Sequence, residues 1–191
     1  MSRVFIGIGS NEGDRLEQIS KAVHILGRLP GCRLVQMATI CETEPAGGPP
    51  QGPYLNTVVE IDTTLKPDAL LHALKAIEAA EGRAPSAARW GPRPIDLDIL
   101  LYEDLVLARP DLLIPHVRLH ERRFVLEPLA QLAPEVCHPV LKRSVAELLA
   151  ELPAPATRSF DSHHGLWPWA RSGFRPTGGR RGTTGSARGA P

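Results

Sequence analysis

Residues 54–63 read YLNTVVEIDT, a run rich in β-branched side chains that is typical of a strand. A second strand is expected before it, at 33–41 (RLVQMATIC), and the loop between the two strands carries four prolines and three glycines. After it, Pro67 begins a helix expected over 67–81. One face of this helix is apolar and consists of Leu70, Leu74 and Ile77. The centre of the chain therefore predicts strand, strand and helix in succession.

Farther out, the hydrophobic pattern predicts a short buried strand at 3–9, an amphipathic helix at 14–29 and a strand at 95–102. Two more helices are expected at about 121–132 and 144–152. The order is β-α-β-β-α-β with C-terminal helices appended. This is the order of a ferredoxin-like α+β sandwich, in which helices pack on one face of a mainly antiparallel sheet.

The chain divides by composition into a body and a tail. We expect one domain over 1–153, followed by a disordered basic segment at 154–191 that is rich in Gly, Arg and Pro. The tail has six arginines against one acidic residue, whereas the body has 16 basic and 20 acidic side chains. Because the body has no basic surplus, we expect no nucleic-acid partner, although an Arg-Gly tail could also bind RNA.

The cellular setting follows from a few further features. Three cysteines without CxxC spacing argue against a disulfide framework or a zinc site and favour reduced thiols. The N-terminal apolar run is too short for the core of a signal peptide, and no run approaches the length of a membrane span. We expect a cytoplasmic protein without membrane association, and a monomer.

The densest chemistry lies at 89–100, RWGPRPIDLDIL. Asp96 and Asp98 are two residues apart on an expected strand, so their carboxylates project from the same face. Such a pair suits Mg²⁺, which binds carboxylate oxygen and completes its shell with substrate phosphates. Nearby arginines can bind phosphate oxygens; they are Arg83, Arg89 and Arg93. The sequence thus suggests a polyphosphate site, while an ordinary solvated strand face is the alternative.

The same twelve residues resemble the signature of the 6-hydroxymethyl-7,8-dihydropterin pyrophosphokinases. The other motifs of that family occur in its order: Gly9-Ser10-Asn11, Glu42-Thr43-Glu44-Pro45, Tyr54-Leu55-Asn56, Ile77-Glu78 before Gly82-Arg83, and Pro115-His116 before Arg122 and Phe124. The resemblance covers about residues 1–152. Two positions depart from the family's pattern: Pro85 stands near an expected second arginine, and Glu44 stands where proline is common.

The resemblance implies pyrophosphate transfer from ATP to the hydroxymethyl group of the reduced pterin, with AMP leaving, in tetrahydrofolate biosynthesis. It implies catalytic roles for Asp96, Asp98, Arg83 and Arg93, and two Mg²⁺ ions held by the two aspartates. It implies contacts with ATP for Glu78, Arg89, Ile99, His116 and Arg122. It implies a pterin site made of Thr43, Pro45, Ala46, Tyr54, Asn56, Trp90 and Phe124. The loops 42–53 and 82–94 would act as lids.

Two other functions remain open at this stage. The fold class hosts many activities, so a non-catalytic module that binds a small ligand or RNA is one alternative. A nucleotidyltransferase that uses the same aspartate pair, and releases pyrophosphate instead of AMP, is the other. A dinucleotide fingerprint at Gly7, Gly9 and Gly13 is not supported, because the glycine spacing is wrong.

Overall fold

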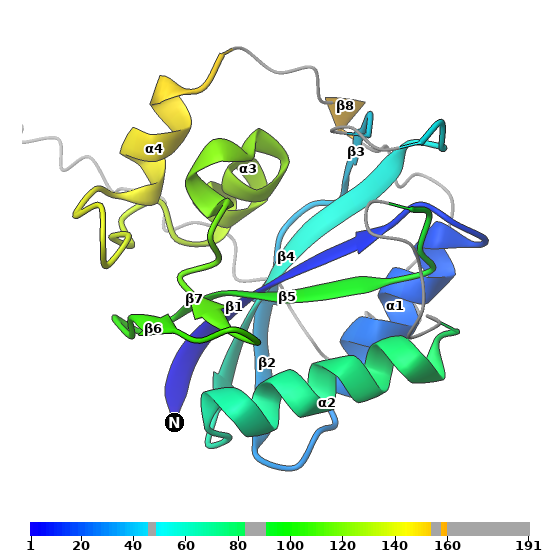
Figure 1. Cartoon of the computed structure of the whole chain (residues 1–191), viewed down its shortest axis with the longest axis horizontal. Coiled ribbons are helices and arrows are strands. Elements are labelled where there is room, and N and C mark those ends of the chain that lie inside the picture. The colour runs from blue at the N-terminus through cyan, green and yellow to red at the C-terminus, as the bar shows by residue number, and fades with distance from the viewer. Residues whose placement is uncertain (46–48, 83–90, 154–157, 160–191) are drawn as a thin grey trace, which may run out of the picture.

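The computed structural model describes residues 1–45, 49–82, 91–153 and 158–159. They form an antiparallel sheet with helices packed on it (Figure 1). The strands of this sheet are β1 (Ser2–Ser10), β2 (Cys32–Met37), β3 (Cys41–Thr43), β4 (Tyr54–Thr63), β5 (Asp96–Tyr102) and β8 (Arg158–Ser159). The helices are α1 (Arg15–Leu26), α2 (Pro67–Ala80), α3 (Arg123–Leu132) and α4 (Val145–Glu151). The fold class is therefore α+β, as expected.

The sheet runs in the order β5-β1-β4-β3-β8, and every pairing in it is antiparallel. Strand β2 pairs with the same edge of β4 as β3 does, but farther along the strand. The central strand β1 pairs with β4 along its whole length and with β5 from Val4 to Gly9. On each face of the sheet, side chains of β4 and β5 therefore lie next to side chains of β1.

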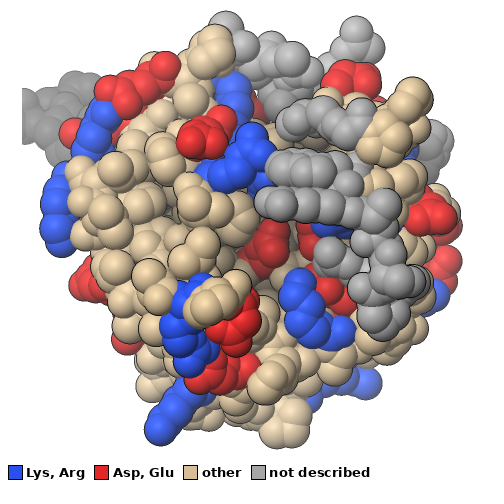
Figure 2. Space-filling view, in the orientation of Figure 1, with Lys and Arg blue, Asp and Glu red and all other residues tan. Residues whose placement is uncertain are grey.

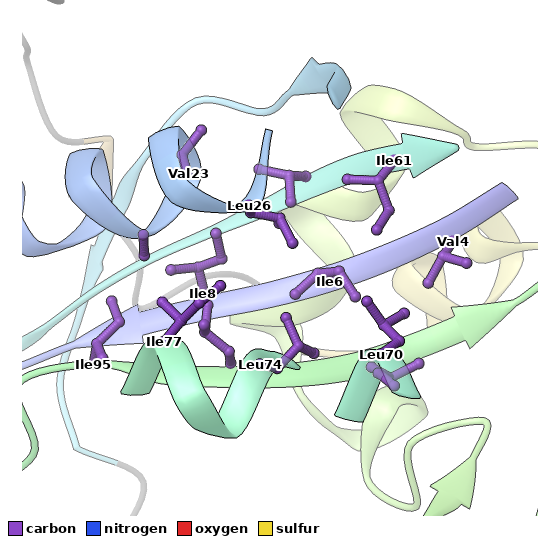
Figure 3. Packing of buried hydrophobic residues seen from close by; sticks show 14 of the residues in the cluster. Val4, Ile6, Ile8, Val23, Leu26, Ile61, Leu70, Leu74, Ile77 and Ile95 are labelled. Carbon is purple, nitrogen blue, oxygen red and sulfur yellow. The ribbon is translucent and has the colours of Figure 1, made fainter. Parts of the chain in front are cut away.

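Helices cover both faces of the sheet, so the molecule has three layers (Figure 1). Helices α1 and α2 pack on one face, where Val4, Ile6 and Ile8 of β1 point (Figure 3). Helices α3 and α4 pack on the other face, where they bury Phe5 of β1 and Val58 of β4. The sequence analysis expected helices on one face, and the second helical layer corrects that expectation. Alternation along β1 supplies both cores from one strand.

The strand expected at 33–41 is two strands in the structure. Strand β2 ends at Met37 and β3 begins at Cys41. In the break, the main-chain N–H and the hydroxyl of Thr39 both donate to Gln131 Oε1 of α3, at 3.0 and 2.7 Å. Because the Thr39 main chain is bonded to a helix on one face of the sheet, it cannot continue the ladder with β4.

Other differences are small. Helix α1 ends at Leu26, because the next N–H groups, of Arg28 and Leu29, bond carbonyls three residues back. A hairpin of β6 (Leu107–Ala108) and β7 (Leu113–Ile114), followed by a 3₁₀ helix at Leu119–Glu121, was not expected. Within the segment expected to be disordered, 158–159 form β8 on the edge of β3, and the rest lies outside the described residues. No helix in the described part of the chain is long and apolar enough to cross a membrane.

Candidate active site

The floor of the candidate site is a glycine pair on the central strand. Gly9 pairs with Asp96 of β5 on one side and with Asn56 of β4 on the other. Gly7 pairs in the same way with Asp98 and Val58. Since neither glycine has a side chain, this face of the sheet is recessed along β1, between the aspartates of β5 and the asparagine of β4.

A pocket lies over this floor, on the face of the sheet that α3 and α4 leave partly open. Its empty space is about 870 Å³, counting the part that opens to solvent. Acidic side chains are recessed near the middle of the face shown in Figure 2, and basic side chains lie around them. The charged residues that line the pocket are Glu44, Arg93, Asp96, Asp98 and Arg122.

Asp96 and Asp98 lie on one face of β5, as their spacing predicted, and both line the pocket. Arg93 donates to Asp96 Oδ2 from Nη1 at 2.9 Å. Among the described residues, no group of three or more His, Cys, Asp and Glu side chains is placed to hold a metal ion. A pair of carboxylates on one face of a strand fits Mg²⁺, which is commonly bound by one or two carboxylates and by phosphate oxygens.

Arg122 directly precedes α3 and lines the pocket. Its Nε is buried and has no hydrogen-bond partner in the described part of the molecule. Burial lowers the pKa of Arg122, and the nearby charge of Arg118 lowers it further. Because a guanidinium keeps its charge even so, this buried donor is suited to a polyanionic ligand.

His116 lies beside the aspartates. Burial, followed by the charge of Arg122, lowers the pKa of His116 to about 4, so the ring is neutral at pH 7. The Arg118 N–H donates to His116 Nδ1 at 3.2 Å, and a main-chain N–H can only donate. The neutral ring therefore carries its proton on Nε2, which lies 3.9 Å from Asp98 Oδ2. From there, Nε2–H can donate to an oxygen of a ligand near the aspartates.

Away from the aspartates, the pocket presents flat side chains. Tyr54 and Phe124 both line it, and the Arg122 guanidinium lies 5.6 Å from the centre of the Phe124 ring. The Asn56 amide donates to Thr43 Oγ1 at 2.7 Å, and both residues are buried. That bond fixes the orientation of the amide, so the oxygen of Asn56 faces Gly9. An aromatic, hydrogen-bonding ring fits this arrangement.

Two residues hold the segment that leads into β4: Asn11, directly after β1, and Arg15, the first residue of α1. Arg15 donates from Nη1 to Glu42 Oε1 and to the carbonyl of Pro53, both at 2.8 Å. These contacts join the beginning and the end of the loop at 42–53. Asn11 donates to Gln51 Oε1 at 2.9 Å from its side-chain amide.

The structure thus brings together most of the described residues that the sequence analysis assigned to the site. The pocket contains Thr43, Tyr54, Asn56, Arg93, Asp96, Asp98, Arg122 and Phe124. Pro45 and His116 are described but do not line the pocket, although His116 lies 3.9 Å from Asp98. Outside the described residues lie Ala46, Arg83, Pro85, Arg89 and Trp90.

Two expected ATP contacts lie on the other face of the sheet. Glu78 of α2 is buried and accepts from the main-chain N–H of Leu97 and from Lys75, both at 2.8 Å. Ile99 is part of the core under α1 and α2. Glu78 holds the start of β5 in place, and only the main chain of Ile99 could reach a ligand in the pocket.

The sequence analysis did not single out Gly7, Gly9, Gln51 or Asn11 for the site. Gly7 and Gly9 carry a recognisable signal, since small residues at alternate positions of a strand leave one face open. Gln51 carries none, and Asn11 carries only its place in the motif Gly9-Ser10-Asn11, because the contacts of both depend on how the loops fold back onto the end of β1.

Comparison with known proteins identifies the family. The chain belongs to the 7,8-dihydro-6-hydroxymethylpterin-pyrophosphokinase family, whose model matches residues 5–134. It is accordingly a diphosphotransferase, that is, an enzyme of pyrophosphoryl transfer.

Its relatives include both short and long chains. It is 43% identical over 153 residues to the 2-amino-4-hydroxy-6-hydroxymethyldihydropteridine pyrophosphokinase of Pseudomonas aeruginosa, covering 80% of this chain and 93% of that protein. It is 41% identical over 158 residues to the folic acid synthesis protein fol1 of Schizosaccharomyces pombe, covering 83% of this chain but only 21% of that protein. The wild-type Plasmodium falciparum HPPK-DHPS crystal structure has the same fold, with a TM-score of 0.63, 14% identity, and coverage of 78% of this chain and 44% of that chain.

Proposed function

We propose that this enzyme transfers the β,γ-pyrophosphate of ATP to the hydroxymethyl oxygen of 6-hydroxymethyl-7,8-dihydropterin, in the pathway to tetrahydrofolate. The products are the pterin diphosphate and AMP. One observation carries the proposal: a carboxylate pair and two arginines line the same pocket as an asparagine and two aromatic rings. The pocket thus has one end suited to a metal–polyphosphate complex and another suited to a flat heterocycle.

Asp96 and Asp98 would hold Mg²⁺, two ions with the nucleotide. When bound, Mg²⁺ neutralises phosphate charge and orients the phosphoryl group for in-line attack. The support is the donor set itself, two carboxylates on one face of a strand with room above the neighbouring glycines. Arg93, which donates to Asp96, would turn its remaining N–H groups toward the phosphates.

Arg122 and His116 would bind the phosphates from the side of α3. The assignment is supported by two donors: the buried Nε of Arg122, which has no partner among the described residues, and the Nε2–H of His116. Arg83, Arg89 and Trp90 would complete the nucleotide and pterin contacts from the loop at 82–94. These donors stabilise the charge that moves to the bridging oxygen as the bond from the β-phosphorus to AMP breaks.

Tyr54 and Phe124 would lie against the faces of the pterin ring. Asn56, oriented by Thr43, would bind the amino-pyrimidinone edge, and Pro45 and Ala46 would belong to the same pocket. The hydroxymethyl oxygen would then point along the floor toward the aspartates. As this oxygen bonds to the β-phosphorus, its proton passes to a base.

Product analysis tests the reaction. We expect AMP and pterin diphosphate in equal amounts when the purified protein receives ATP, Mg²⁺ and the hydroxymethyl-dihydropterin, and no AMP when pterin is omitted or EDTA is added. Release of pyrophosphate in place of AMP would instead indicate nucleotidyl transfer. Pterin binding without any product would indicate a non-catalytic module.

Substitution tests the metal assignment. We expect Asp96→Asn to lower kcat at least about 100-fold, because the metal loses one of its two protein ligands. Asp104→Asn is the matched control, since Asp104 is an exposed aspartate in the turn after β5 and does not line the pocket. Equal activity of the two variants would contradict the assignment of Asp96.

Three further proposals complete the description. The order β5-β1-β4-β2, with antiparallel pairs and crossover helices α1 and α2, supports classing the body as ferredoxin-like. We propose that residues 1–153 are the catalytic domain, and that the enzyme works as a cytoplasmic monomer without nucleic acid. Light scattering of the purified protein tests the monomer directly.

A further inference from the structure

Asn11 lies directly after β1 and contacts both segments that form the rims of the pocket. It is 8% exposed. Its Oδ1 accepts from the Arg93 N–H at 2.8 Å, and its own N–H donates to the Arg93 carbonyl at 3.2 Å. Its Nδ2 donates to Gln51 Oε1 at 2.9 Å and to the Gly52 carbonyl at 3.4 Å. One buried side chain thus joins residues 82 and 40 positions away along the chain.

The partners fix which way the amide points. The Arg93 N–H can only donate and the Gly52 carbonyl can only accept, so the oxygen must face Arg93 and the nitrogen must face the loop. An amide can do both at once, whereas a carboxylate can only accept and a hydroxyl is too short to span the two segments. The residue type is therefore matched to the junction.

Each contacted segment leads to one end of the pocket. Arg93 in turn donates from Nη1 to Asp96 Oδ2 at 2.9 Å. Gln51 in turn accepts from the Tyr54 hydroxyl through Oε1, at 3.3 Å. Hydrogen bonds therefore run from the aspartate end to the aromatic end through Asn11, along the side of the pocket where β1 ends.

We propose that Asn11 is a positioning residue that sets the distance between the phosphate end and the ring end of the pocket. The inference rests on the proposed function, because in-line transfer requires the pterin oxygen and the β-phosphorus to be held within about 0.5 Å of their productive positions. Asn11 does not itself line the pocket. Its amide fixes the Arg93 main chain through Oδ1 and the Gln51 loop through Nδ2. Loss of either contact should therefore have a different effect on kcat and KM.

Two substitutions separate the contact with Arg93 from the contacts with Gln51 and Gly52. Asn11→Ala removes both, and we expect kcat to fall about 100-fold, the loss typical of a reactant misplaced by about 1 Å. Asn11→Asp keeps the acceptor for the Arg93 N–H and removes the donor to Gln51 and Gly52. For Asn11→Asp we expect kcat within about fivefold of wild type and a KM for the pterin raised about tenfold, since only the ring end loosens.

Thr63→Ala is the control for loss of a buried polar group. Thr63 is fully buried and is the last residue of β4, whereas Tyr54 at the first position of β4 lines the pocket. The Thr63 hydroxyl donates to the Gly31 carbonyl at 3.0 Å and accepts from the Leu65 N–H at 3.1 Å. We expect it to lower stability as Asn11→Ala does while kcat stays within about threefold of wild type. Equal kcat losses in Asn11→Ala and Thr63→Ala would overturn the proposal, because a merely structural role predicts them.

Amide hydrogen exchange in the free proteins gives a second test that needs no activity. We expect faster exchange of the Arg93 amide in Asn11→Ala but not in Asn11→Asp, and faster exchange across 51–54 in both. If Asn11→Ala does not fold, Asn11→Asp decides, and unchanged exchange across 51–54 overturns the proposal. If the wild-type protein forms no AMP, the proposed function falls, while exchange still reports whether Asn11 joins the two segments.

Discussion

At the scale of single residues, His116 makes the stability of the free protein depend on pH. Its pKa is lowered from 6.5 to about 4, chiefly by burial. Between these values the unfolded chain binds a proton that the folded chain does not, so stability is complete above pH 6.5 and falls as the pH approaches 4. The free energy of unfolding should lose roughly 3 kcal/mol through this group.

His116→Gln should remove that part of the pH dependence. Urea unfolding at pH 7 and pH 4, without metal or nucleotide, compares the loss in His116→Gln with that in wild type. His24→Gln serves as the control, because His24 is exposed on α1. Equal losses in the wild type and in His116→Gln would contradict a neutral, buried His116.

Gly9 should be needed for pterin binding and not for folding. A Cβ at Gly9 would lie 3.1 Å from Asn56 Oδ1, and the bond to Thr43 prevents that amide from turning away. We expect Gly9→Ala to raise the KM for the pterin about tenfold, because the added methyl group displaces the amide that would bind the ring. At Gly7 the nearest atom is a methyl of the flexible Leu100 side chain, at 3.2 Å, so Gly7→Ala should have the smaller effect on KM. The reverse order would count against the assigned role of Asn56.

Sequence periodicity places residues on a face but not in a pocket. The shared face of Asp96 and Asp98 follows from alternation along one strand, and the structure confirms that both line the pocket. Asn11 could not be found in this way. Its role depends on two loops that fold back on the end of β1, and nothing in the local pattern records that meeting.

At the scale of elements, the long strands were predicted best. Strand β4 has the predicted bounds, 54–63, because its β-branched residues are buried along most of its length. The break between β2 and β3 was missed, since it depends on Gln131, far away in the chain. The hairpin of β6 and β7 was missed because two-residue strands have no measurable periodicity.

The placement of α3 and α4 also lay beyond the sequence pattern. Each has an apolar side, but an apolar side does not say which face of the sheet it covers. The answer depends on Phe5, Val58 and Leu100, which alternate away from the first core and leave a second apolar surface. Both layers are therefore encoded in the strands rather than in the helices.

At the scale of the molecule, the body should fold without the tail. The described contacts of the body continue to its last residues, where Arg123 Nη1 donates to the carbonyls of Leu152 and Pro153 at 3.1 and 2.9 Å. We expect a chain cut after Pro153 to melt within about 3 °C of the full chain, equivalent to about 1 kcal/mol. Its kcat should be unchanged.

The described contact that the cut removes is the pairing of β8 with β3. Since β3 ends at Thr43, a raised KM for the pterin in the shortened chain would show that β8 supports the ring end of the pocket. A melting temperature lowered by 10 °C or more, roughly, would contradict the division of the chain at 153.

The floor of the pocket belongs to the strand that both cores share. Its other residues, among them Val4, Phe5 and Ile6, are buried on one face or the other. An inhibitor that draws its affinity from this floor therefore rests on backbone that the enzyme cannot rearrange and remain folded. Resistance to such a compound would have to arise on the rims of the pocket, where substitutions leave the sheet intact.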